Sequence, residues 1–216
     1  ISDIGYSSRP GDATAINAVA GEDLGAALIV DYLTQQKNIP TEILTAPCTQ
    51  GTRKGVRLDR WIHTMEGKKN IYYQTEIKNW SAHAIGGKKL SVTASAKEIS
   101  DHKKERWKNI WADSTFKNPQ KSTARKVLQP MKLPEGYNGE LRPLICFWDA
   151  MHPRGRDEPF FSVPVNDPNY PNFKKLWVFS MSAYLRNQRT DKRIIRLSLE
   201  RTEKRIELLK EMFVTP

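Results

Sequence analysis

Ile71-Tyr-Tyr-Gln-Thr-Glu-Ile-Lys-Asn-Trp80 is the stretch of sequence that decides the fold, because its alternation is typical of a β-strand. Side chains two residues apart on a strand project from the same face. One face would carry Ile71, Tyr73, Thr75 and Ile77, and the other Tyr72, Gln74, Glu76 and Lys78. A carboxylate and an ammonium are thereby predicted to lie side by side.

A second alternating stretch, Val56-Arg-Leu-Asp-Arg-Trp-Ile-His-Thr-Met65, precedes this strand. Alternation predicts Val56, Leu58 and Ile62 on one face, and Arg57, Asp59, Trp61 and His63 on the other. Glu66-Gly-Lys-Lys-Asn70 between the two stretches is typical of a hairpin turn. The pair therefore predicts antiparallel strands, one with Asp59 and one with Glu76 and Lys78 opposite an apolar face.

The remaining patterns predict an α/β fold, with a central mixed β-sheet flanked by helices. Helical spacing of apolar residues marks three segments, and short apolar runs mark three strands. The expected helices are Gly21–Leu33, Ser95–Asp113 and Arg193–Met212, and the expected strands are Thr41–Ala46, Arg142–Trp148 and Leu176–Met181.

Length and composition favour one globular domain. The 216 residues are 38% hydrophobic, enough to bury one substantial core. We expect an N-terminal arm over residues 1–19, then a single domain over 20–216 with a basic insertion around 86–132 and a C-terminal helix around 193–212. The chain begins at Ile1 rather than Met, so the sequence leaves open whether a segment precedes Ile1.

Positive charge points to a polyanionic partner. The 35 Lys and Arg against 24 Asp and Glu give a net charge of +11, and residues 86–132 alone hold twelve basic and four acidic residues. A solvated helix face is the alternative for this block, with Trp107 and Trp111 in the core. The candidate DNA contacts are Lys88, Lys89, Lys97, Lys103, Lys104, Lys121, Arg125 and Lys126.

Several classes of protein do not fit the sequence. No run approaches the roughly 18 apolar residues of a membrane-spanning helix, so we expect a soluble, cytoplasmic protein with no membrane partner. Cys48 and Cys146 lack any Cys-x-x-Cys spacing and are expected to be buried thiols.

The acidic residues on the hairpin suit a magnesium site. Mg²⁺ prefers hard oxygen ligands, which Asp59, Glu76 and the backbone carbonyl of Ile77 could supply. Lys78 beside the ion could orient the attacking water and neutralise charge on a phosphate. These residues predict hydrolysis of a phosphodiester.

Asp59, sixteen intervening residues and then Glu76-Ile77-Lys78, behind a helix with Glu22, resembles the PD-(D/E)XK nuclease superfamily. The resemblance covers about residues 20–150, although Leu58 stands where the motif has proline. It implies a restriction endonuclease-like fold with an αβββαβ core. It also implies Mg²⁺, with Mn²⁺ able to substitute, on Asp59, Glu76 and Glu22, and a catalytic role for Lys78.

Two alternatives stay open within the motif. Glu66-Gly67-Lys68 also fits a Glu-x-Lys pattern, but it lies in the turn, where its carboxylate would face solvent. Glu22 could instead interact with the helix macrodipole, as Asp23 could. His63 is expected to be structural, and Asp149, His152 and Asp157 to belong to an ordinary loop.

The sequence as a whole favours a metal-dependent DNA endonuclease of restriction, repair or mobile-element type, with DNA as partner and a homodimer as one arrangement. The alternative from another class is a catalytically inactive nuclease-fold subunit that binds DNA. An RNA-directed nuclease is a third hypothesis, without an aromatic RNA-binding motif to support it.

Overall fold

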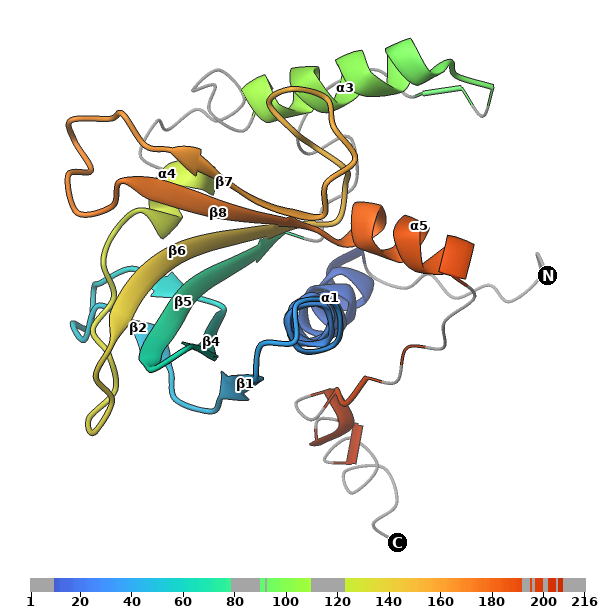
Figure 1. The fold of residues 1–216 in the computed structure, drawn as a ribbon. Helices are drawn as coiled ribbons and strands as arrows, with labels where there is room; N and C mark the ends of the chain where they lie inside the picture. The colour runs from blue at the N-terminus through green and yellow to red at the C-terminus, as the bar shows by residue number, and fades with distance from the viewer. Residues whose placement is uncertain are drawn as a thin grey trace, which may run out of the picture.

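A six-stranded mixed sheet forms the centre of the protein (Figure 1). The computed structural model describes residues 10–78, 90–91, 93–109, 123–191, 195, 197–199, 202–204 and 206–207, with side chains for these residues except at 10–19, 123–124 and 189–191. In spatial order the strands are β1 (Thr41–Leu44), β4 (Arg60–Glu66), β5 (Lys69–Lys78), β6 (Glu140–Phe147), β8 (Lys175–Ser180) and β7 (Phe160–Pro164).

The sheet combines both kinds of strand pairing. Strands β1, β4 and β5 are antiparallel neighbours, β5, β6 and β8 run parallel, and β7 returns antiparallel at the edge. The predicted α/β class and mixed sheet are confirmed. Since parallel strands end at one edge, the carboxyl ends of β5, β6 and β8 lie together there, at Lys78, Phe147 and Ser180.

Helices cover both faces of the sheet (Figure 1). Helix α1 (Pro10–Asp31), its π-helical continuation η1 (Tyr32–Gln36) and α5 (Met181–Asp191) pack on one face. On the other lie α4 (Thr123–Val127), a small sheet of β2 (Cys48–Thr49) and β3 (Arg57–Leu58), and Trp107 of α3 (Ala96–Asn109). A separate apolar core fills each interface, giving a three-layer molecule.

Strand β5 contributes to both cores, as its alternation predicts. Ile71, Tyr73 and Ile77 face α1, whereas Tyr72 packs in the opposite core. Gly25 lets α1 approach closely, because a Cβ there would lie 2.7 Å from Cγ2 of Ile77. Helix α1 is therefore held against the carboxyl end of β5.

The single strand predicted for residues 56–65 is wrong, because the chain bends at Asp59. Residues on either side pair with different partners: β3 with β2, and β4 with β1 and β5. The bend shifts the alternation by one residue, so Leu58 and Trp61 share one core while Ile62 joins the other. Asp59 itself lies outside the ladder of paired residues.

Helix boundaries also differ from the predictions. Helix α1 begins at Pro10, a residue favoured in the first turn, so residues 10–19 are helical rather than an irregular arm. Residues 1–9 lie outside the described part. Residues 195 and 197–199 are not helical, and the described helical residues near the C-terminus are 202–204 and 206–207. Helix α5 was not predicted.

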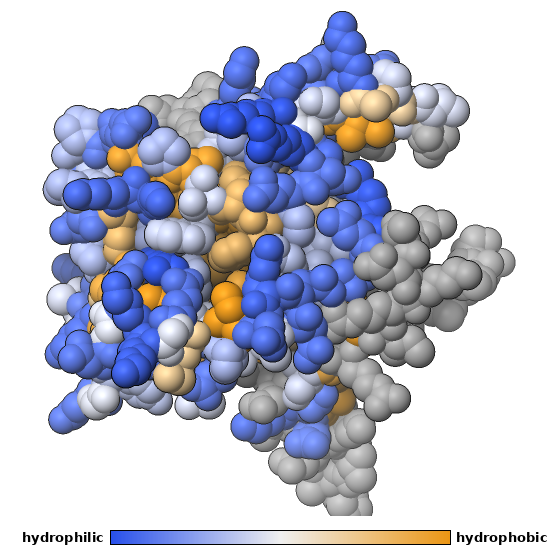
Figure 2. Space-filling view, viewed as in Figure 1, coloured by the Kyte–Doolittle hydropathy of each residue, from blue (hydrophilic) through white to orange (hydrophobic). Residues whose placement is uncertain are grey.

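Hydrophilic side chains dominate the face shown in Figure 2, with small apolar patches between them. On this face, hydrophilic side chains thus lie between the apolar patches and solvent. Among the described helices, none combines the length and apolar character needed to cross a bilayer.

Candidate active site

Asp59 is fixed by the backbone of β5. Its amide donates to the Thr75 carbonyl at 3.0 Å, and its carboxylate Oδ2 accepts from the Ile77 amide at 2.6 Å. The bend between β3 and β4 therefore directs the carboxylate toward the carboxyl end of β5. The predicted proximity of Asp59 to the Glu76-Ile77-Lys78 segment is present in the structure.

Glu76 lies on the face of β5 away from α1, with only 1% of its side chain exposed. Lys78, two residues along the same face, forms an ion pair with Oε1. Lys126 of α4 adds a second ion pair, with Nζ at 2.8 Å from Oε1 and 2.9 Å from Oε2. One buried carboxylate is therefore held between two ammonium groups.

The Ile77 carbonyl lies on the Asp59 side of β5. In a strand, the amide and carbonyl of one residue face the same neighbour, and the Ile77 amide points to Asp59. The β4–β5 ladder ends at Arg60 and Thr75, before this carbonyl, and the Lys78 carbonyl accepts from the Trp148 amide on the β6 side. Ile77 therefore presents its backbone oxygen on the Asp59 side of β5; its role as a metal ligand stays a prediction.

The carboxylates repel one another in this buried setting. Burial raises the pKa of Asp59 to about 6, and the nearby charges of Glu76 and Glu22 act in the same direction. The Ile77 amide and Lys78 partly oppose this shift. The Asp59 carboxyl, which would otherwise ionise near pH 4, thus has its pKa closer to neutral pH. Shifts of this kind are common in functional sites.

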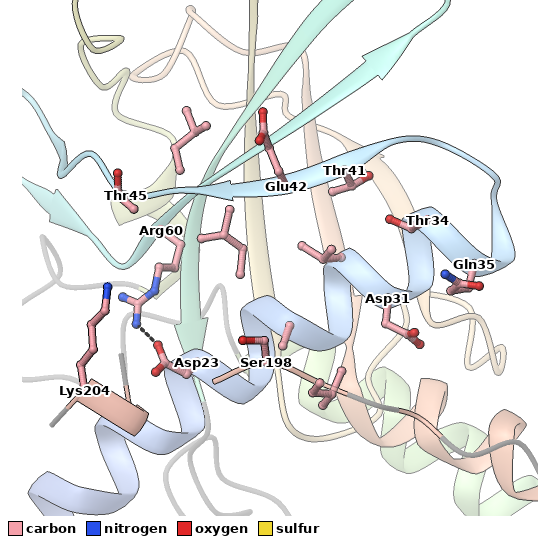
Figure 3. Close-up of a pocket in the computed structure, with 15 residues that line it drawn as sticks. Asp23, Asp31, Thr34, Gln35, Thr41, Glu42, Thr45, Arg60, Ser198 and Lys204 are labelled. Carbon is pink, nitrogen blue, oxygen red and sulfur yellow. Dashed lines mark hydrogen bonds and ion pairs between the residues drawn. The ribbon is translucent and has the colours of Figure 1, made fainter. Parts of the chain in front are cut away.

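Glu22 and Asp23 lie inside α1 rather than at its start, and both contact Arg60. Arg60, buried at the start of β4, contacts Glu22 at 3.3 Å and forms an ion pair with Asp23 (Figure 3). The amide and hydroxyl of Thr202 also donate to Asp23, at 2.7 and 2.8 Å. Although burial disfavours its charge, these bonds hold the pKa of Asp23 below its ordinary value.

Glu22 therefore borders the site through its charge, while Asp23 joins α1 to β4 and to the C-terminal segment. The Arg60–Asp23 pair also lines a cavity of about 790 Å³ between α1 and β1 (Figure 3). Of the two acids at this point of the helix, only Glu22 stands near Asp59 as a site candidate.

Gln74 positions Lys126. Its side-chain amide donates to the carbonyls of Val127 and Gln129, each at 2.7 Å, and its oxygen accepts from the Met131 amide at 2.9 Å. These bonds hold the end of α4 over β5. Sequence reasoning placed Lys126 among the DNA contacts and missed its link to Glu76, since the only sequence signal was a polar residue inside a buried strand.

The rival Glu66-Gly67-Lys68 lies at the opposite end of the hairpin. Glu66 accepts a bond of 2.6 Å from Arg142, and Gly67 adopts a φ of +63° in the turn. His63 is similarly engaged at a distance from Asp59, between Glu42 and Asn70. Neither residue belongs to the group around Glu76.

The candidate DNA contacts divide by burial. Lys103 is buried and lies 3.1 Å from Asp157, so it serves the ion pairs that join α3 to the loop after β6. Lys97 is exposed, whereas Lys104 pairs with Asp101 and Arg125 with Asp167. Lys88, Lys89 and Lys121 lie outside the described residues.

The polar residues after β6 and the two cysteines have structural roles. Asp149 forms an ion pair with Arg106, and His152 Nδ1 accepts from the Arg154 amide at 3.0 Å. Cys48 and Cys146 are buried free thiols, as predicted, and burial raises the pKa of both. The loop interpretation of Asp149 and His152 agrees with these contacts.

A divalent cation fits the donor set at Asp59 and Glu76. The charge of Glu76 raises the cost of ionising the half-buried Asp59, so a cation shared by the two carboxylates would stabilise the pair, and Mg²⁺ commonly has one or two protein carboxylates. Within the described ranges, no three His, Cys, Asp or Glu side chains form a metal-holding group. Backbone carbonyl, water and phosphate oxygens would complete the shell.

No protein-family model, curated protein or solved structure matches the chain. Functional statements about the site therefore depend on its residues and geometry.

Proposed function

We propose that the protein is a metal-dependent DNA endonuclease with a restriction endonuclease-like fold, of the PD-(D/E)XK type. The observation that carries the proposal is the meeting of Asp59, Glu76 and Lys78 at one end of β5, with Asp59 held by the Ile77 amide. The chain order of helix α1, strands β1, β4 and β5, helices α3 and α4, and strand β6 agrees with the αβββαβ core.

Each residue has a distinct part in this proposal. Asp59, Glu76 and the Ile77 carbonyl would hold Mg²⁺ or Mn²⁺, which when bound supplies positive charge for the phosphate. Lys78 would orient the attacking water through its ammonium. Burial of Glu76 and the backbone bond to Asp59 keep both carboxylates in place before substrate arrives.

The direct test is incubation of supercoiled and linear DNA with the protein in Mg²⁺, in Mn²⁺ and in chelator. We expect metal-dependent nicking by the parent protein and its loss in Asp59→Asn and Glu76→Gln, because each removes a charged oxygen ligand. Glu66→Gln is the matched control, since its carboxylate pairs with Arg142 at the far end of the hairpin. Cleavage that required Glu66 and not Glu76 would refute the site.

A second candidate is a nuclease-fold subunit that binds DNA without cleaving it. The observation in its favour is that Lys78 and Lys126 already neutralise Glu76 in the protein alone. The same assay separates the two functions, because such a subunit would retard DNA in a gel and leave plasmid intact with either metal.

A further inference from the structure

The contact between Lys126 and Glu76 has the geometry of a bound cation. Nζ lies 2.8 and 2.9 Å from the two carboxylate oxygens, so one ammonium bridges both atoms of the group. Charge-assisted bonds of this kind are strong, particularly to a carboxylate removed from water. Glu76 is such a carboxylate.

A buried carboxylate requires a counter-ion, since an isolated charge is costly in a low dielectric. Lys78 forms an ion pair with Oε1 of Glu76, while Lys126 reaches both oxygens. A metal ion shared with Asp59 would also need an oxygen of Glu76. Lys126 and the metal therefore compete for the same carboxylate.

Lys126 is also the lysine that can leave. Its side chain is 37% exposed, against 17% for Lys78, and it stems from a five-residue helix rather than from the central sheet. A lysine whose side chain is partly exposed can move its ammonium into water by changing rotamer. Lys78 is held on β5 beside Glu76 and can remain during this movement.

We propose that Lys126 is a built-in counter-ion that holds Glu76 in the metal-free protein and is displaced when the catalytic metal binds. This inference rests on the proposed function, because it requires that the site takes a divalent cation. It assigns Lys126 a positioning role, and it predicts that the resting protein binds metal more weakly than its carboxylates alone would allow.

The test is calorimetric titration with Mn²⁺ of the full chain and of two substitutions at Lys126 with different expected results. Lys126→Met removes the competing charge and is expected to bind Mn²⁺ about tenfold more tightly, the change that corresponds to one hydrogen bond to a charged group. Lys126→Arg keeps a bidentate donor and is expected to bind it no more tightly than the parent. Lys132→Met, an exposed lysine of the same segment, is the matched control.

A second measurement, the melting temperature, checks that Lys126→Met is folded. Without metal, Lys126→Met should melt at a lower temperature than the parent, because Glu76 has lost a partner, and excess Mn²⁺ should narrow the difference. Cleavage is not needed for either measurement.

The outcomes separate the two proposals. If the parent binds Mn²⁺ and cleaves DNA, but Lys126→Met binds no more tightly than Lys132→Met, the counter-ion role is refuted and the proposed function stands. If neither the parent nor Lys126→Met binds Mn²⁺, the metal-dependent function fails, and the counter-ion role fails with it.

Discussion

Asp59 is the residue on which the site depends most, because its side chain and its amide both bind β5. The carboxylate accepts from Ile77 and the amide donates to Thr75. The residue therefore ends the β4–β5 ladder and at the same time places an acid beside Glu76. A single residue links the bend in the chain to the chemistry of the site.

Asp59→Asn should make stability less dependent on pH in chelator. The folded pKa of about 6 lies above the ordinary value of 3.8, so the native state binds the proton more tightly, and stability falls as the pH rises from about 4 to about 6. Asn retains a hydrogen-bond acceptor without the charge. Chemical denaturation should show a gain of about 1–2 kcal/mol at pH 8 that shrinks toward pH 4. An equal effect at both pH values would contradict this explanation.

Lys78→Ala should slow cleavage strongly, by about a hundredfold or more, while leaving DNA affinity nearly unchanged. DNA affinity should change little because Lys78 is one of 35 basic residues. Cleavage should slow because Lys78 pairs with Glu76, where it would orient the attacking water. Single-turnover cleavage and a binding titration in chelator would measure the two effects. Lys68→Ala, an exposed lysine in the turn at the far end of the hairpin, is the control. Equal losses of binding and cleavage would make Lys78 a binding residue.

Among the individual residues, sequence spacing was sufficient to select Asp59, Glu76 and Lys78 as neighbours. The contact of Lys126 with Glu76 was not predictable, because it joins residues fifty positions apart. It depends on Gln74, whose side chain binds backbone groups after α4. Such a contact leaves no periodic signal.

At the scale of elements, Gln74 joins β5 to the segment that follows α4. Gln74→Met should lower the free energy of unfolding by about 3 kcal/mol, because two carbonyls and one amide would lose their partner in the buried interior. Urea denaturation would measure the loss. Thr64→Val is the control, as the buried Thr64 hydroxyl has no hydrogen-bond partner within the described structure. A loss below 1 kcal/mol would mean that contacts other than those of Gln74 hold the segment after α4 on β5.

Local patterns were sufficient to predict several elements. The β4–β5 hairpin alternates, the helix through Leu24 and Leu28 has helical spacing, and the buried strands β6 and β8 are short apolar runs. The bend at Asp59 was not, since it arises from pairing of β3 with β2 and from bonds to β5. Helix α1 extends to Pro10 through residues of low periodicity. The prediction failed where distant contacts, not local pattern, decide the conformation.

At the scale of the whole molecule, the twelve basic residues of the block 86–132 overstate the positive charge that this block offers to DNA. Part of the basic block neutralises acids inside the protein: Lys103 pairs with Asp157, which also lies 3.6 Å from Arg186, and buried Arg106 pairs with Asp149. The cations of α3 thus divide between structural and exposed positions. Composition could give the total charge but not this division.

DNA affinity should fall steeply between 50 and 200 mM salt, because neutralised phosphates release counterions, by about a thousandfold for six contacts. Lys97→Gln should reduce the slope of log affinity against log salt by about one. Lys103→Gln should leave the slope unchanged and lower the melting temperature, since the Lys103 side chain is buried and already paired with Asp157. Fluorescence anisotropy across a salt series would measure the slopes. A flat response in the parent would argue against a backbone-binding surface.

The parallel pairing of β5 with β6 has a consequence for the order in which the protein folds. The β4–β5 hairpin closes through a two-residue turn and brings Asp59 to Glu76 through local contacts. Strand β6 joins β5 only after the long chain between Lys78 and Glu140 has closed, and Lys126 lies within that chain. Loop closure over such a distance is slow relative to hairpin formation. During synthesis the two carboxylates would therefore meet before Lys126 has arrived, so the nascent site holds Asp59 and Glu76 with Lys78 but without its second lysine.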